Sequence, residues 1–241
     1  MKDYIKQTEM DPTLLSGYSI WIIMGLVMVL SWIIQTTLTS RFNKYSQVRT
    51  PNGMTGAQVA QKMLNDNGIY DVKIVSIPGQ LTDHYNPVNK TVNLSEGVYS
   101  RASIAAAAIA AHECGHVLQH ATGYAPLKMR SALVPVVSFS NNIVMWVIMA
   151  GLFVISVFPG IFWAGVGLFA MSTLFSLVTL PVELNASHRA VSWLRSSGVA
   201  DAATLPLATD ALKWAAYTYV IAALGSLATL MYYISLGRGR D

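Results

Sequence analysis

Four apolar stretches, each near the length of a membrane-crossing helix, constrain the fold of this chain more than any other feature. They cover residues 17–38, 133–158, 161–180 and 214–236. A transmembrane helix needs roughly 20 predominantly apolar residues. Of the 241 residues, 53% are hydrophobic and only 12% are charged, which is too apolar for an ordinary soluble domain. We therefore predict a mainly α-helical protein with four transmembrane helices in a lipid bilayer.

The polar segments between these stretches predict the organisation of the rest of the chain. Residues 39–131 are long enough for an extramembrane domain, and residues 181–213 read as a shorter helical segment. Most lysines and arginines outside the apolar stretches fall in these two segments, which places both on the cytoplasmic side by the positive-inside rule. The net charge of +4 is scattered along the chain, so we expect no nucleic-acid partner.

One motif in the long segment predicts a metal site. His112, Glu113 and His116 follow the alanine-rich run 104–111, which contains no proline and favours a helix. Residues four apart on a helix share a face, so the two imidazoles can converge on one metal ion, which we expect to be zinc. Glu113 lies roughly 100° around the helix from His112 and can take a proton from a water at the metal. Cys114 points away from the metal and is expected to pack, whereas Gly115 predicts close approach of another backbone or of substrate.

Two short alternating runs precede this helix. Residues 72–77 and 90–94 read as strands, with the turn-forming stretch 81–87 between them. We expect a small sheet beside the metal helix, with an edge strand that could pair with an extended substrate. His84 in the turn-forming stretch is a weaker candidate for a metal ligand than for a surface group.

The third zinc ligand must come from elsewhere, because a catalytic zinc usually takes three protein ligands. His120 lies one turn beyond His116, too far along the helix to join the pair. Glu183 directly follows the third apolar stretch, where an unpaired carboxylate is costly, and is our candidate; the alternative is a glutamate paired with Arg189. His188 and Asn185 are candidates for holding a zinc-bound histidine or the transition state.

Several motifs resemble those of the YugP-like family of neutral zinc metallopeptidases of bacterial membranes. The resemblance rests on residues 83–87, 92–95, 110–119, 123–125 and 181–187 and runs in register over nearly the whole chain. More distantly, the chain is similar to HtpX-like and CAAX prenyl membrane proteases. The resemblance implies a small α+β, gluzincin-like metallopeptidase domain, one zinc ion per chain, Glu183 as third ligand and a bacterial inner-membrane location. It also exposes a departure, since Asn185 and Ser187 stand where acidic residues are common in these relatives.

The sequence leaves two functions open. The first is a membrane-embedded zinc endopeptidase that hydrolyses protein or peptide substrates with a zinc-activated water and Glu113 as general base; His188, His120 and Tyr124 are candidates for stabilising the oxyanion. The second is a non-catalytic metal-binding membrane protein that serves as a structural or partner-binding element, which the two missing acids favour.

Overall fold

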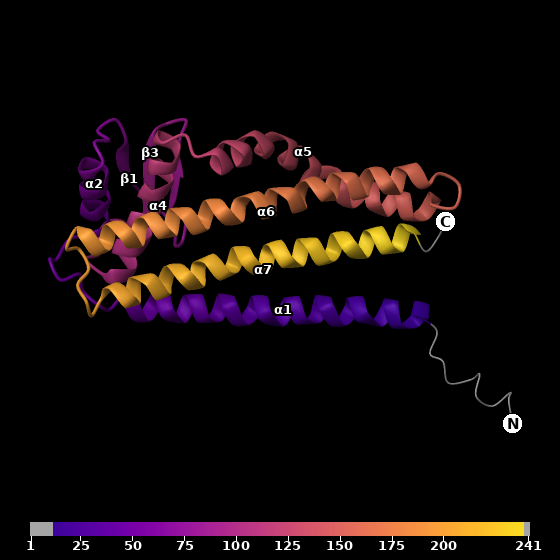
Figure 1. The fold of residues 1–241 in the computed structure, drawn as a ribbon, viewed down its shortest axis with the longest axis horizontal. Coiled ribbons are helices and arrows are strands. Elements are labelled where there is room, and N and C mark those ends of the chain that lie inside the picture. The colour runs from indigo at the N-terminus through magenta and orange to yellow at the C-terminus, as the bar shows by residue number, and fades with distance from the viewer. Residues whose placement is uncertain (1–11, 239–241) are drawn as a thin grey trace, which may run out of the picture.

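The computed structural model describes residues 12–238, with side chains from residue 21 onward. Within that range the chain forms seven helices and three strands. Figure 1 shows four long helices that run alongside one another, with a small domain gathered at one end of them. In chain order the elements are α1 (Pro12–Tyr45), α2 (Gly56–Asp66), β1 (Lys73–Ile77), β2 (His84–Asn86), β3 (Thr91–Ser95), α3 (Glu96–Tyr99), α4 (Ile104–Ala121), α5 (Ala125–Val154), α6 (Pro159–Ser196) and α7 (Leu205–Arg238).

The four long helices α1, α5, α6 and α7 are each long and apolar enough to cross a membrane. This confirms the prediction of a mainly helical chain with four candidate membrane-spanning helices. Large apolar side chains point outward along them, such as Trp21 on α1, 71% exposed, and Phe153 on α5, 84% exposed. Outward apolar side chains on a long helix are typical of contact with lipid.

The long helices extend beyond the predicted transmembrane stretches, because hydropathy marks the apolar part of a helix and not its ends. Helix α6 continues through Pro181 to Ser196, and α7 already begins at Leu205. Residues 181–213 are therefore two helix ends and a short connection. Pro159 begins α6, where its missing N–H costs little.

Helices α5 and α6 form a closely packed hairpin. A Cβ atom added at Gly151 would lie 2.5 Å from the Cα of Phe162, and one added at Gly165 would lie 2.7 Å from the Ile148 side chain. Small residues at these positions let the two backbones approach, which is a common way for membrane helices to associate.

The small sheet has three strands in the order β1-β3-β2. Strand β1 pairs in parallel with β3, with Lys73 opposite Thr91, and β2 pairs antiparallel to β3, with Tyr85 opposite Val92. The predicted sheet beside the metal helix is present, but the prediction of only two strands was wrong. Strand β2 lies in the stretch assigned to turns, and three residues are too few to show an alternating pattern.

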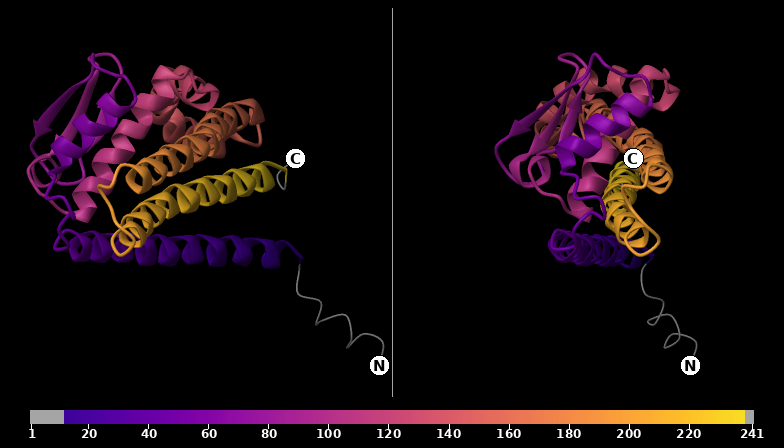
Figure 2. Two further views of the ribbon diagram at one scale, coloured as in Figure 1. Left: turned by 60° about the vertical axis from the view of Figure 1, so that its left-hand side comes forward. Right: turned by 90° about the vertical axis from the view of Figure 1, so that its left-hand side faces the viewer.

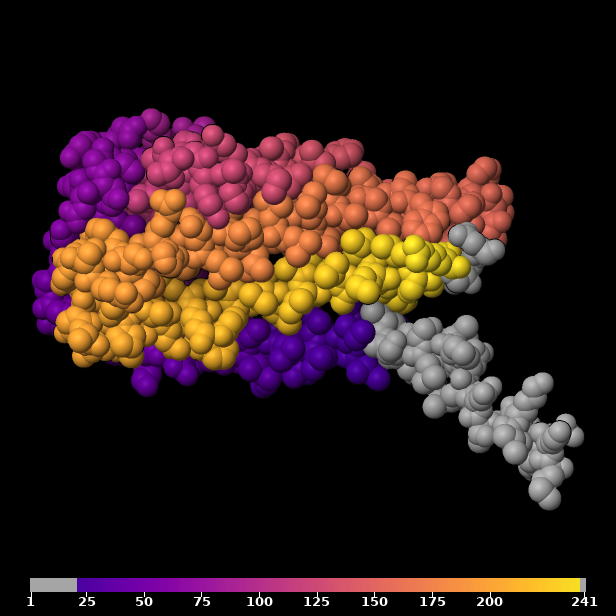
Figure 3. Space-filling view, in the orientation of Figure 1, coloured from indigo at the N-terminus to yellow at the C-terminus, as the bar shows by residue number. Residues whose placement is uncertain are grey.

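Helices α2 and α4 pack with β3 to build the core of the small domain. Thr55 caps α2, since its hydroxyl accepts a hydrogen bond from the Gln58 N–H in a capping box. Val59 and Met63 of α2 and Val92 and Leu94 of β3 are fully buried in this core together with the alanines of α4. The sheet lies on the outer side of the domain (Figure 2), and α6 and α7 lie across another side of it (Figure 3).

Candidate metal centre

The two histidines of the motif meet one carboxylate from a distant part of the chain. His112 and His116 lie in the middle of α4, and Glu183 lies on α6. The Glu183 Oε2 atom is 3.2 Å from the Nε2 of His112 and 3.5 Å from the Nε2 of His116. One ligand atom from each residue falls within 4.8 Å of the other two. The geometry thus brings together the three residues that we predicted as metal ligands.

Gly115 allows this meeting, because it lets α6 approach α4. A Cβ atom added at Gly115 would lie only 2.6 Å from the carbonyl oxygen of Ala186. The predicted close approach is therefore to the backbone of α6, and it holds Glu183, one turn before Ala186, beside the histidines.

Cys114 faces the opposite way and is fully buried, with its thiol 3.6 Å from the Ala60 carbonyl. Burial raises the pKa of this thiol, so Cys114 stays protonated and packs as predicted.

Each histidine has a partner for its other ring nitrogen. The Nδ1 of His112 is 3.1 Å from the Ser187 hydroxyl. The Nδ1 of His116 donates to the side-chain oxygen of Gln119 at 3.0 Å. Gln119 is itself fixed, because its amide nitrogen donates to the Val182 carbonyl at 2.7 Å and to Asn185 Oδ1 at 3.1 Å. A proton on Nδ1 leaves Nε2 with its lone pair, which is the tautomer that a zinc ligand needs.

The three residues fit a zinc ion. Two imidazole nitrogens and one carboxylate oxygen are a common ligand set of catalytic zinc. Glu183 is only 3% exposed, and a buried carboxylate requires a positive partner. Burial disfavours protonation of His116. The hydrogen bond to Glu183 and the negative charge of Glu183 outweigh this effect and raise the pKa of His116 above its ordinary value of 6.5. In the metal-free protein, a proton can thus stand in for part of the positive charge that zinc would supply.

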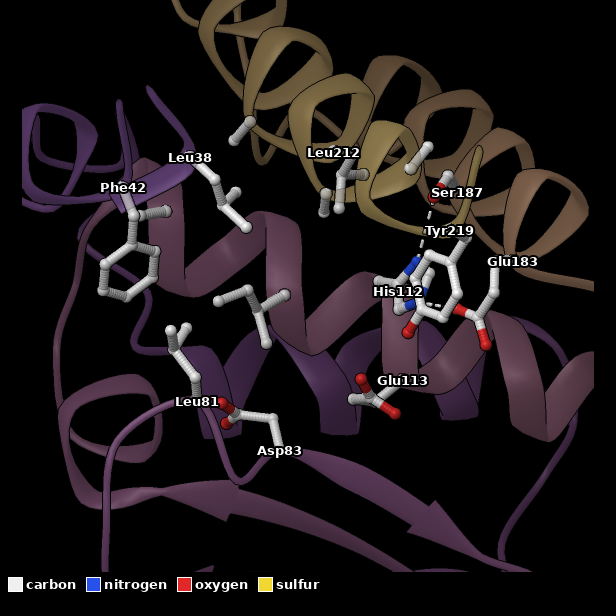
Figure 4. Close-up of a pocket in the computed structure, with 15 residues that line it drawn as sticks. Leu38, Phe42, Leu81, Asp83, His112, Glu113, Glu183, Ser187, Leu212 and Tyr219 are labelled. Atoms are coloured by element: carbon white, nitrogen blue, oxygen red, sulfur yellow. Dashed lines mark hydrogen bonds and ion pairs between the residues drawn. The ribbon is translucent and has the colours of Figure 1, made fainter. Parts of the chain in front are cut away.

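Two cavities border the three candidate ligands, and Glu113 lines both. The smaller cavity has a volume of about 180 Å³ and the larger about 490 Å³. Glu113 is buried apart from the surface that faces them. Figure 4 shows its carboxylate directed into the smaller cavity, away from the oxygen of Glu183 that meets His112. Glu113 is therefore beside the candidate metal position without belonging to the ligand set.

Sequence reasoning missed Tyr219 and Arg130 at this site. Tyr219 of α7 lines both cavities. The Nη1 of Arg130, on the first turns of α5, is 3.9 Å from Glu183 Oε1. Its Nε is buried and has no hydrogen-bond partner among the described residues. An arginine just before an apolar stretch and a tyrosine inside another were the available signals, and both also suit a membrane interface.

The other candidates from the sequence lie away from the metal position. His188 is exposed on α6 and lines neither cavity. Arg189 donates to Asn185 Oδ1 at 2.8 Å, so the alternative pairing of Glu183 with Arg189 is wrong. His120 lies 3.1 Å from the Tyr85 hydroxyl at the larger cavity. His84 is exposed on β2 and lines the larger cavity, but it is not in the group of possible ligands. Tyr124 lines a separate cavity.

Comparisons with known proteins agree with this geometry. The model of a family described as "Putative neutral zinc metallopeptidase" matches residues 20–238. A protein of Bacillus subtilis (strain 168) named "Putative membrane protease YugP" is 40% identical over 213 residues, which cover 88% of this chain and 94% of that protein. No solved structure matches the chain significantly. The family resemblance predicted from the motifs is confirmed, whereas the gluzincin-like assignment stays a prediction.

Proposed function

Since this chain belongs to the putative neutral zinc metallopeptidase family, we propose that it is a zinc-dependent endopeptidase that cleaves membrane proteins or peptides. The observation that carries the proposal is the position of Glu113. It lies beside a fitting ligand set but outside it, and it opens to both neighbouring cavities. A glutamate in this position has an obvious use in hydrolysis and none in holding a metal.

His112, His116 and Glu183 would hold one zinc ion per chain. When bound, zinc would lower the pKa of a neighbouring water molecule and polarise the scissile carbonyl group. Ser187 and Gln119 keep the Nε2 atoms of the two histidines directed at the metal position. Arg130 balances the outer oxygen of Glu183, which keeps that carboxylate in place.

Glu113 acts as the general base and then as the general acid. It takes one proton from the attacking water as the oxygen adds to the peptide carbonyl carbon. It then delivers that proton to the amide nitrogen as the C–N bond breaks. The products are a carboxylic acid and an amine, and transfer of the acid's proton to the amine leaves a carboxylate and an ammonium group. Tyr219 replaces His188 as our candidate for the hydrogen-bond donor to the carbonyl oxygen as it gains negative charge, because Tyr219 lines both cavities.

The site lies near the membrane surface on the cytoplasmic side of a bacterial inner membrane in this proposal. The small domain and the connection between α6 and α7 share one end of the helix bundle (Figure 1), as they must if both segments face the same compartment. Residues 39–131 and 181–213, which contain the small domain and the adjoining ends of α6 and α7, also hold most of the lysines and arginines outside the apolar stretches, which favours the cytoplasm. The smaller cavity has walls from α1 and α7, two of the helices long and apolar enough to cross a membrane, which supports a substrate that comes from the bilayer.

The non-catalytic alternative loses its main support. It was favoured by the absence of acidic residues at positions 185 and 187. Ser187 nevertheless contacts His112, and Asn185 holds Gln119, which accepts from His116. Neutral side chains here keep the contacts that would orient the ligands.

A comparison of the parent protein with Glu113→Gln tests the proposal. Both are purified in detergent, their bound zinc is measured, and cleavage of unfolded casein is followed with added zinc. We expect one zinc ion in each and cleavage by the parent only, since the variant keeps the ligands but lacks the base. Equal cleavage by both proteins would refute the role of Glu113, and absence of zinc from both would refute the metal site.

A further inference from the structure

The smaller cavity beside the candidate metal centre is lined mainly by apolar side chains. Leu38 and Phe42 of α1, Ile109 of α4, and Leu212 and Ala215 of α7 form its walls. Figure 4 shows Leu38, Phe42 and Leu212 at one end of the cavity and His112 and Glu113 at the other. The cavity thus begins at the groups that would perform the chemistry and extends away from them between the helices.

We propose that this cavity receives the side chain of a residue flanking the scissile bond, and that this side chain is apolar and between leucine and phenylalanine in size. The inference rests on the proposed peptidase function and specifies which peptide bonds it selects. The polar rim of Glu113, Glu183 and Tyr219 would lie along the substrate backbone, and the apolar end would receive the side chain.

The size of the cavity sets the size of the side chain. An apolar cavity of about 150 Å³ in another protein accommodates a benzene molecule, and this one has a volume of about 180 Å³. The space exists because small residues line it where larger ones would fill it. These residues are Ala105 on α4 and Ala211, Ala215 and Ala216 on α7. A leucine, methionine or phenylalanine side chain fits, whereas alanine would leave most of the cavity empty.

The charges of the lining disfavour polar side chains. Asp83, Glu113 and Glu183 are acidic, and no lysine or arginine lines this cavity among the residues that the structure describes. An acidic substrate side chain would therefore be repelled. Asp83 is held at the edge of the sheet, because it accepts hydrogen bonds from the Ser95 N–H at 2.8 Å and from the Ser95 hydroxyl at 3.1 Å. The side chains at the apolar end of the cavity, Leu38, Phe42 and Leu212, offer a lysine ammonium group no hydrogen-bond acceptor, and burying that group there is costly.

The wall that α1 supplies is fixed in place. The Tyr45 hydroxyl donates to Asp210 Oδ2 at 2.6 Å, and the Arg41 guanidinium donates to the same oxygen at 2.8 Å. These contacts join α1 to α7 next to Leu38 and Phe42. The cavity is thus formed before substrate binds, which reduces the entropy lost on binding.

The test uses a series of quenched fluorescent peptides that differ at one position beside the cleaved bond, with Ala, Leu, Phe, Trp, Asp or Lys there. For the full-length parent protein in detergent with zinc, we expect kcat/KM to be about tenfold or more higher with Leu than with Ala, since one methylene in an apolar pocket is worth about 10- to 200-fold. Asp and Lys should give the lowest values. A flat series, or a preference for Lys, would overturn the inference.

Three variants connect the preference to this cavity. Ala215→Leu should fill it and abolish the preference for Leu over Ala, and Phe42→Ala should enlarge it and admit Trp. Ala222→Leu is the matched control, because Ala222 lies exposed on the same helix and lines neither cavity, and it should keep the parent's preference. If Ala215→Leu lost zinc or failed to fold, Phe42→Ala would decide. Unchanged preferences in the folded variants would overturn the assignment.

Binding to the Glu113→Gln variant separates this inference from the proposed function. Fluorescence anisotropy of the same uncleaved peptides should show tighter binding with Leu than with Ala, again by about tenfold or more. Equal binding of both peptides, with casein still cleaved by the parent alone, would overturn the cavity assignment and leave the peptidase function standing. Equal casein cleavage by the parent and Glu113→Gln would instead refute the function, and with it the inference.

Discussion

Replacing Gly115 by alanine would disturb the contact that brings the third ligand to the histidines. The new Cβ atom would lie 2.6 Å from the Ala186 carbonyl oxygen, whereas ordinary contacts begin at 3.4 Å, so α6 must move by roughly 0.8 Å. Glu183 would move with it. Zinc–ligand distances tolerate only about ±0.2 Å, so we expect zinc affinity to fall by about tenfold or more.

The cost in stability follows from the same contact. Overpacking typically costs about 1 to 3 kcal/mol, and the upper end applies here because both sides of the contact are backbone. Alanine regains about 1 kcal/mol in helix propensity, which leaves a net loss of about 2 kcal/mol. For a chain of this length, Tm should fall by about 4 to 8 °C.

Chelator competition measures the zinc affinity, and thermal unfolding in detergent measures Tm. Gly167→Ala on α6 is the matched control, since an added Cβ there meets no atom within 4 Å. Its zinc affinity should stay near that of the parent, and its Tm should rise by about 2 to 4 °C from the same gain of about 1 kcal/mol in helix propensity. Parent-like zinc affinity and Tm in Gly115→Ala would refute the claim that this contact positions Glu183.

Three further changes test other parts of the site. Ser187→Ala removes the partner of His112 and should lower zinc affinity about 10- to 100-fold, whereas Ser187→Asp should restore it; chelator competition distinguishes the two. Asp210→Asn weakens the contacts that join α1 to α7 and should lower Tm by about 2 to 4 °C, which corresponds to about 1 kcal/mol, with zinc content unchanged. Zinc at about 100 times its Kd should stabilise the protein by about 2.7 kcal/mol. In a pH series of melting curves this gain should shrink as the pH falls, beginning above 6.5, because the raised pKa of His116 lets protons compete with zinc.

Local patterns were enough to predict the four long helices, helix α4 and the three candidate ligands His112, His116 and Glu183. The apolar stretches marked four long helices, and the alanine run with His112 and His116 marked a helix with a metal-binding face. Glu183 was identifiable because an acidic residue at the end of an apolar stretch needs a partner. Gly115 likewise signalled a close contact. Both residues are unfavourable where they stand in the sequence, a carboxylate at the end of an apolar stretch and a glycine inside a helix. Each therefore indicated a contact that compensates for the cost.

The remaining features depend on contacts between distant segments, which no local pattern encodes. Tyr219 reaches the site because α7 packs against both α4 and α6, and in the sequence it is one aromatic residue among many in an apolar helix. Strand β2 forms because β3 offers it a partner, and its own three residues carry no strand signal. His188 was misplaced for a related reason: with α6 helical throughout, His188 points outward while Ser187 points to His112.

The departure from acidic residues at positions 185 and 187 changes the electrostatics of the site more than its geometry. An aspartate at 187 would add a negative charge beside His112, close to Glu183 and Glu113. Ser187 and Gln119 instead contact the two histidines without a charge, so the buried negative charge near the metal position remains with the two glutamates. A ligand set with less surrounding negative charge should leave the bound zinc a stronger Lewis acid and hold it less tightly. For that reason the Ser187→Asp variant should bind zinc at least as tightly as the parent and have a lower kcat. A Ser187→Asp variant with both a higher zinc affinity and a higher kcat than the parent would contradict this account of the neutral substitution.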